Sequence, residues 1–229
     1  MSLYAKTISQ VRDDLMAEVG WEGTASQAKV VRLLNESLVD LSGLHDWAFL
    51  TEHSTATTTD ATGVLTMPDD LDRILAIHER GTEEILTQIS PLEYEQNRES
   101  DTSEVPKSYI IKGYDQDTDV EVPHMEIEIV PAPASGTVYN VWYIKLAEEL
   151  VDGSTTPPFP PYIWQLIQQH ALVKLMRKAS VESVIYNNAQ QQYELMLYRA
   201  KEREKLGSGK RHAIRNLESV DIYRATRMG

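Results

Sequence analysis

Apolar residues recur at three- and four-residue steps between positions 23 and 50, the segment GTASQAKVVRLLNESLVDLSGLHDWAFL. The stripe consists of Val31, Leu34, Leu38 and Leu41, and charged residues occupy the positions between them. This spacing predicts an amphipathic helix, because it gathers the apolar side chains on one face. Thr24 and Gln27 have the spacing of a capping box at its start, and Gly43 marks its end.

Three further stretches have the same helical period. The first precedes this segment and stops at Gly20, and the other two follow a Pro-rich stretch that ends near residue 160. Their apolar stripes are Tyr4, Ile8, Val11, Leu15 and Val19; then Trp164, Ile167, Ala171 and Leu175; then Val181, Ile185, Ala189, Tyr193, Met196 and Ala200. The chain is therefore expected to begin and end with a pair of helices.

Between residues 52 and 144 the pattern changes to short extended runs separated by turns. MEIEIV alternates apolar and acidic residues, which is typical of a strand with one face exposed to water. The runs on either side of Asp60 to Gly63, and those on either side of Gly81, are expected to form hairpins. Ser90 and Pro91 predict the start of a short acidic helix. About six strands are expected in an antiparallel β-module.

The fold class predicted from these patterns is α+β. Residues 1–50 and 151–206 are expected to build a four-helix body, and residues 51–150 an inserted β-module. Residues 207–229 are expected to form an extended, flexible tail, because Gly207 and Gly209 release it from the last helix.

Charge is distributed unevenly along the chain. The net charge of the whole chain is −13, and residues 207–229 hold five basic and two acidic side chains, or +3, which leaves −16 on the rest. Such asymmetry favours an interaction arm, although a solvated end is the simpler alternative. The candidate binding residues of the tail are Lys210, Arg211, Ile214, Arg215, Leu217, Val220, Ile222, Tyr223, Arg224 and Arg227. We expect this tail to be disordered when free and to fold on a partner.

Candidate catalytic and metal-binding chemistry is weak. The chain has no cysteine, and its six histidines lie far apart with no HExxH pair and no GxSxG motif. The segment 207–210, GSGK, lacks the Ser or Thr of a phosphate-binding loop, and the acids in MPDDLDRI suit a turn better than a cation site. No apolar run is long enough for a membrane span. We therefore expect no enzyme activity, no cofactor, no metal and no membrane partner.

Six sequence blocks in a fixed order carry a family resemblance. They are LNESLVDLSGLHDWAFL, MPDDLDRILAI, VPKSYIIKG, IEIVPAPASGTVYNVWYIKLAEEL, PPFPPYIWQLIQQHALVKLM and QQYELMLYRAKERE, and they all fall between residues 25 and 205. In this order the blocks resemble the adaptor, or head-to-tail connector, proteins of tailed bacteriophages.

The resemblance implies a virion structural protein of the neck, made in the host cytoplasm. It would bind the portal as a ring, commonly of twelve copies, and contact a neck or tail protein on the other side. Viral DNA would pass through the ring without sequence-specific binding. Glu126 and Glu128 in MEIEIV could border this channel and repel DNA, although an ordinary exposed sheet face is the simpler interpretation.

Two other functions stay open at this point. One is a different neck or tail-completion ring protein. The other is a DNA-binding packaging protein that uses the basic tail, because clustered Lys and Arg side chains can neutralise phosphates.

Overall fold

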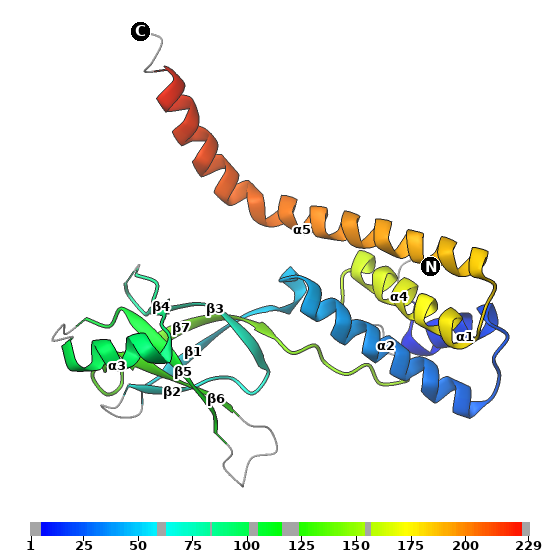
Figure 1. The fold of residues 1–229 in the computed structure, drawn as a ribbon, viewed down its shortest axis with the longest axis horizontal. Helices are drawn as coiled ribbons and strands as arrows, with labels where there is room; N and C mark the ends of the chain where they lie inside the picture. The colour runs from blue at the N-terminus through cyan, green and yellow to red at the C-terminus, as the bar shows by residue number, and fades with distance from the viewer. Residues whose placement is uncertain are drawn as a thin grey trace. The chain divides into compact units, whose positions relative to one another are not determined.

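The computed structural model describes residues 6–58, 63–82, 84–100, 105–115, 124–153 and 157–225, with the backbone alone for 96–100, 115 and 206–225. The chain divides into two compact units (Figure 1). Residues 1–49 and 147–229 form a helical unit, and residues 50–146 form a β unit. A mixed α+β fold is thus confirmed, with five α-helices and two small sheets in the described residues.

Helix α1 spans Ile8–Glu18 and begins with a complete capping box. The Thr7 side chain accepts a hydrogen bond from the Gln10 backbone N–H, and the Gln10 side chain accepts one from the Thr7 backbone N–H. These two bonds satisfy donors that a helix start leaves unpaired. Ile8, Val11 and Leu15 of the predicted stripe are buried, whereas Tyr4 lies outside the described residues.

Helix α2, Thr24–Leu44, covers the predicted central helix, but its expected capping box is wrong. The N-cap is Gly23, with φ of 85° and no side-chain cap, and Thr24 is already helical. A positive φ is accessible to glycine at little cost, so the helix begins one residue earlier than the Thr24 signal indicates. The buried residues of α2 are Val30, Leu33, Leu34, Ser37, Leu38 and Leu41.

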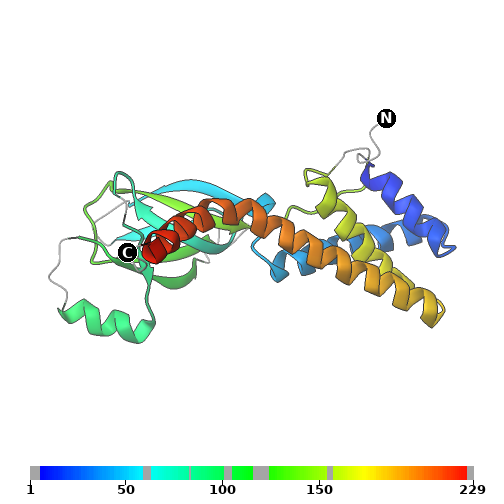
Figure 2. The ribbon, with the colours of Figure 1, turned by 90° about the horizontal axis from the view of Figure 1, so that it is seen from above.

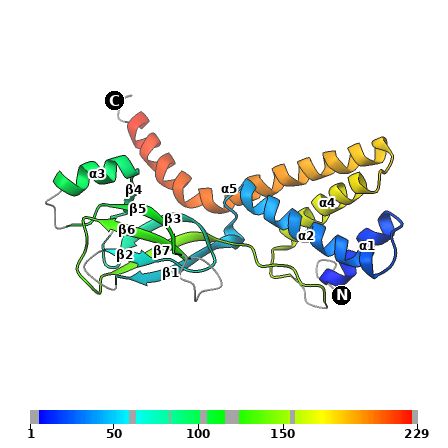
Figure 3. The ribbon, with the colours of Figure 1, turned by 60° about the horizontal axis from the view of Figure 1, so that its bottom comes forward.

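Helices α4, Pro161–Lys178, and α5, Ser183–Ala225, complete the helical unit. The main helix contacts join α1 to α2, α2 to α4, and α4 to α5. In Figures 1 and 3, α1 and α5 lie on opposite sides of α4, and Figure 2 shows α5 alongside α4. The two N-terminal helices therefore meet the two C-terminal ones through α2 and α4, as one layer in the order α1, α2, α4, α5.

The expectation of an extended backbone after residue 206 is wrong, because helix α5 includes these residues. The helix continues through Gly207 and Gly209 and ends at Ala225. A glycine inside a helix costs about 1 kcal/mol relative to alanine, which weakens a helix without necessarily ending it. Two glycines were therefore insufficient evidence for a break at residue 207.

The described part of the β unit contains seven strands in two sheets. One sheet has the order β1–β7–β3, formed by Thr51–Thr57, Val138–Lys145 and Leu71–Glu79. The other has the order β2–β6–β5–β4, formed by Val64–Thr66, His124–Val130, Ser108–Asp115 and Thr87–Gln88. Helix α3, Pro91–Ser100, begins where Ser90 and Pro91 predict a helix. Apolar residues of both sheets share one core, among them Leu65, Ile77, Ile127, Tyr139 and Val141.

Two expectations for this module are wrong. Strands β1 and β2, which flank residues 60–63, belong to different sheets and pair with β7 and β6 instead of with each other. Strand β4 pairs with β5 in parallel, so the module is not purely antiparallel. At Gly81 the flanking runs are joined by an antiparallel bridge between His78 and Ile85 and by a hydrogen bond from the Leu86 N–H to the Ile77 carbonyl, before the chain enters the second sheet. Local turn signals indicate where the chain reverses but not which strand becomes the partner.

Candidate functional site

The segment that returns the chain to the helical unit is held by both N-terminal helices. The Asn35 amide donates to the Leu150 carbonyl at 3.0 Å and accepts from the Leu150 N–H at 2.8 Å. The Ser9 hydroxyl donates to the Gly153 carbonyl at 2.7 Å, and Arg12 forms an ion pair with Asp152. These polar contacts tie residues 150–153 to α1 and α2, so the helical unit is assembled from both ends of the chain.

A charged cluster lies where α2, α4 and α5 meet. The His170 ring stacks on Tyr193, with ring centroids 4.5 Å apart and an interplanar angle of 11°. Lys174 pairs with Asp40 at 2.6 Å, and Asp40 also lies 3.9 Å from His170. Burial lowers the pKa of His170, the Lys174 ammonium lowers it further, and the Asp40 carboxylate opposes both. The fold therefore favours neutral His170.

Glu204 joins α5 to two other parts of the helical unit. Its carboxylate accepts from the Ala48 backbone N–H at 3.1 Å and from the Tyr162 hydroxyl. The Arg203 guanidinium lies 4.4 Å from the centroid of the Tyr162 ring, a cation–π arrangement. Burial, followed by the Glu204 interactions, raises the pKa of Tyr162 to about 12. Tyr162 therefore stays protonated at neutral pH and keeps its donor for Glu204.

Glu126 and Glu128 lie on the same face of β6, because side chains two residues apart point to the same side of a strand. The alternation predicted for MEIEIV is confirmed, with Met125, Ile127 and Ile129 buried. Glu128 accepts from the Tyr94 hydroxyl at 2.7 Å and pairs with Lys112 at 2.9 Å. Much of its charge is thus balanced within the β unit, and a place at a DNA channel stays a prediction for both residues.

The residues predicted to form the binding tail fall in the last part of α5. Its backbone is helical to Ala225, and Arg227 lies outside the described residues. The remaining predicted tail residues, 210–224, lie on this helix, of which only the backbone is described.

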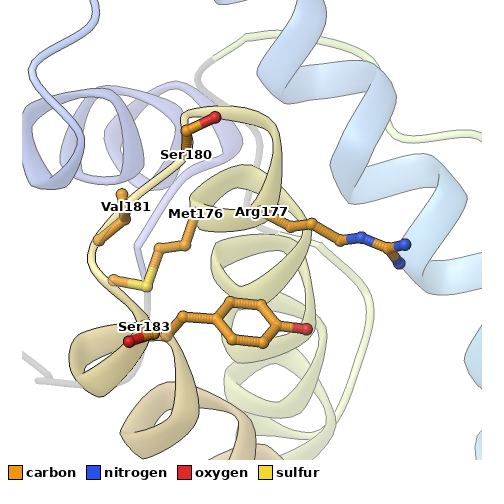
Figure 4. Close-up of a pocket in the computed structure, with 6 residues that line it drawn as sticks. Met176, Arg177, Ser180, Val181 and Ser183 are labelled. Carbon is orange, nitrogen blue, oxygen red and sulfur yellow. The ribbon is translucent and has the colours of Figure 1, made fainter.

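A hollow of about 570 Å³ lies at the turn between α4 and α5. It is lined by Met176, Arg177, Ser180, Val181, Ser183 and Tyr186. Figure 4 shows the Ser180 and Ser183 hydroxyls apart from each other and Arg177 directed away from Met176. Among the described residues, neither a histidine nor a carboxylate lines the hollow, so neither serine has a described base there that could activate it.

Metal-binding clusters and membrane-spanning helices are both absent from the described residues. Among them, no three histidine, cysteine or acidic side chains lie close enough together to hold a metal ion. No described helix has a sufficiently long apolar stretch to span a bilayer.

The fold and contacts define an α+β protein with two units, a helical unit and a double-sheet β unit. The profile of the SU10 adaptor protein family matches residues 2–216, nearly the whole chain. The chain therefore belongs to the SU10 adaptor protein family, whose members are bacteriophage head-tail adaptors, and the family resemblance of the six blocks is confirmed. None of the curated proteins matches the chain.

Proposed function

We propose that this phage adaptor binds the portal protein as a ring at the neck of the virion and extends the DNA channel toward the tail. The observation that carries the proposal is the family match over residues 2–216. The helical unit supports it, because α5 exposes the apolar side chains of Val184, Leu195 and Tyr198, as helices at protein contacts do. In this role the protein is a structural component without catalytic activity.

Assembly is expected to depend on the portal. We propose that the free protein is monomeric or weakly associated in dilute solution and closes into a ring, commonly of twelve copies, on the portal. A head-to-tail interface closes when a template fixes the geometry or when the concentration is high. Sedimentation velocity of the protein alone and with its portal tests this. A species that remains monomeric with portal present contradicts the proposal.

The C-terminal end of α5 is our candidate for the portal contact. Helix α4 has 18 residues, whereas α5 has 43 residues and extends past α4 (Figures 1 and 3). At about 1.5 Å per residue, a helix of this length reaches roughly 65 Å. The basic and apolar residues between Lys210 and Arg227 could then bind acidic and apolar groups on the portal.

Truncation after Leu206 tests this contact. We expect the truncated protein to keep the melting temperature of the helical unit, to lose only the helical signal of residues 207–225, and to lose portal binding. Undiminished affinity for portal rings would place the contact on the layer of helices instead. The full chain and the truncated chain should be compared at equal concentration, because ring closure depends on concentration.

The same two proteins test DNA binding by the basic end. Phosphate-driven binding weakens steeply as salt rises. The adaptor proposal predicts weak duplex binding by both proteins at about 150 mM salt. Tight, steeply salt-dependent binding that disappears on truncation would favour a DNA-binding packaging protein.

A further inference from the structure

Strand β1 forms one border of the sheet β1–β7–β3, and its inner side pairs with β7 without a register shift (Figure 3). The residue after β1 shows which backbone groups face β7. The Thr58 N–H donates to the Thr137 carbonyl at 3.0 Å, and the Thr58 carbonyl accepts from the Gly136 N–H at 2.9 Å. Because backbone directions alternate along a strand, residues 52, 54 and 56 also face β7.

His53, Thr55 and Thr57 therefore direct their N–H and C=O groups away from β7. All three residues are exposed, and none of them has a hydrogen-bond partner on this outer side among the described residues. We call this open row of backbone groups the β1 edge. The partner that fits such a row is an extended chain, because it too donates and accepts in alternation.

The other sheet borders within the described residues are protected. Strands β2 and β4 have only three and two residues. Strand β3 has two register shifts against β7, and on its outer side the Ile77 carbonyl accepts from the Leu86 N–H at 2.8 Å. In contrast, β1 is seven residues long, regular, and without lysine or proline. An edge without these protective features is a site at which another strand can add.

The exposed sheet face beside this edge carries a large aromatic side chain. Trp142 of β7 is 44% exposed, and the centroid of its ring lies 4.8 Å from that of the His53 ring. Exposed tryptophan is enriched at the centres of protein–protein contacts. Open backbone groups next to an apolar anchor favour a protein as the partner over a nucleic acid.

A second copy of this chain offers no matching edge in its described residues. The outer side of β3 is occupied at Ile77, and β2 and β4 are too short. Pairing of β1 with β1 of a second copy would be a two-fold contact that ends in a dimer, whereas a ring needs head-to-tail contacts. The strand that completes the edge is therefore expected from another protein.

We propose that the β1 edge binds an extended segment of the tail-side protein, which adds to the sheet as a further strand beside β1. The inference rests on the proposed adaptor function, which assigns the portal contact to α5 and leaves the β unit for the tail-side partner. The added segment pairs its backbone with His53, Thr55 and Thr57. Beside Thr55 it carries β-branched or polar residues, and beside the buried Ala56, on the opposite face, small apolar ones.

Amide hydrogen exchange tests this pairing on the unmodified protein. Exchange should be compared in the free adaptor, in DNA-filled heads without tails, and in complete virions. The amides of His53, Thr55 and Thr57 should exchange about tenfold more slowly, or slower still, in virions than in tailless heads, because each gains an acceptor. The amides of residues 52, 54 and 56 face β7 in all three samples and serve as the internal control.

Two exchange results would overturn the proposal. One is equal exchange of the three outward amides in tailless heads and in virions. The other is protection that is already complete in tailless heads, which would assign the edge to the portal or to a second copy.

Proline at position 55 tests the backbone contact. T55P removes an N–H that points away from β7, so it blocks the added strand and keeps the β1–β7 ladder. T55V keeps both the N–H and a β-branched side chain and is the matched control. Heads that carry T55P should bind purified tails about tenfold less efficiently than heads that carry T55V. S54P removes an N–H that faces β7 and should instead lower the melting temperature of the β unit.

Normal tail binding by T55P heads would refute the contact, and an equal loss with T55V would assign it to the Thr55 side chain and refute backbone pairing. If T55P melts as early as S54P, the exchange comparison on the unmodified protein decides.

The outcomes separate this inference from the proposed function. Absence of the adaptor from heads and virions refutes the adaptor role and this inference with it. An adaptor that binds the portal and is present in virions, but gains no protection at the β1 edge, refutes the edge contact and leaves the adaptor role standing. Loss of tail binding by T55P with normal portal binding supports both.

Discussion

Replacing Asn35 with alanine should destabilise the helical unit by about 2 kcal/mol. The Asn35 amide makes two hydrogen bonds with the Leu150 backbone, at 3.0 and 2.8 Å. Each bond contributes about 1 kcal/mol, and backbone groups left without a partner in a partly buried site add to the loss. The site is half-buried, so water can reach it, which keeps the expected total near the sum of the two bonds.

The matched control is N188A, which makes the same change at an exposed position of α5. Both variants gain helix propensity, so the difference between them isolates the Leu150 bonds. Unfolding in urea should be followed by tryptophan fluorescence in a W142F background, because Trp142 is the β unit's tryptophan and the other three lie in the helical unit. A difference between N35A and N188A below about 0.5 kcal/mol would refute the view that Asn35 anchors the returning segment.

Three further predictions concern other sites. G63A should lower the free energy of unfolding by about 2 kcal/mol more than G81A does, measured by thermal or urea unfolding. Both glycines have positive φ, but only at Gly63 would an added Cβ lie 2.9 Å from the Ile129 carbonyl oxygen. The pKa of His170 is lowered in the folded protein, so as pH falls the imidazole of the unfolded chain takes up a proton first. The free energy of unfolding should therefore decrease as pH drops below about 6.5. H170Q should lose this pH-dependent part of the stability, and identical pH profiles for the two proteins would contradict the prediction. E126K/E128K should slow DNA ejection from assembled particles if the face borders the channel, and unchanged ejection kinetics would count against that role.

The helices could be predicted largely from the sequence because their stripes reflect burial directly. Ala171 and Leu175 are fully buried, and α2 ends within one residue of the expected Gly43. Trp47 is fully buried and donates its indole N–H to the Leu41 carbonyl at 2.6 Å. Helix starts were less predictable: a Thr-x-x-Gln pattern occurs at both Thr7 and Thr24, and only the first forms a cap.

Strand partners and interaction faces could not be read from local pattern. Strand β1 pairs with β7, far away in sequence, so the hairpin signal between β1 and β2 described a turn and not a pairing. Leu195 and Tyr198 are exposed, although their helical spacing would equally fit a buried stripe. The packing of α4 against α5 decides which apolar side chains of α5 are buried and which are exposed. Glu128 was predicted on an exposed face, but its contacts with Lys112 and α3 depend on long-range folding.

Electron microscopy of the purified adaptor mixed with its portal tests the central claim most directly. The account predicts a second ring stacked on the portal ring, coaxial with it and open at the centre, in the mixed sample, and no such ring in the dilute adaptor alone. Portal particles that keep their original outline with excess adaptor present, while the adaptor remains folded by circular dichroism, would contradict the account.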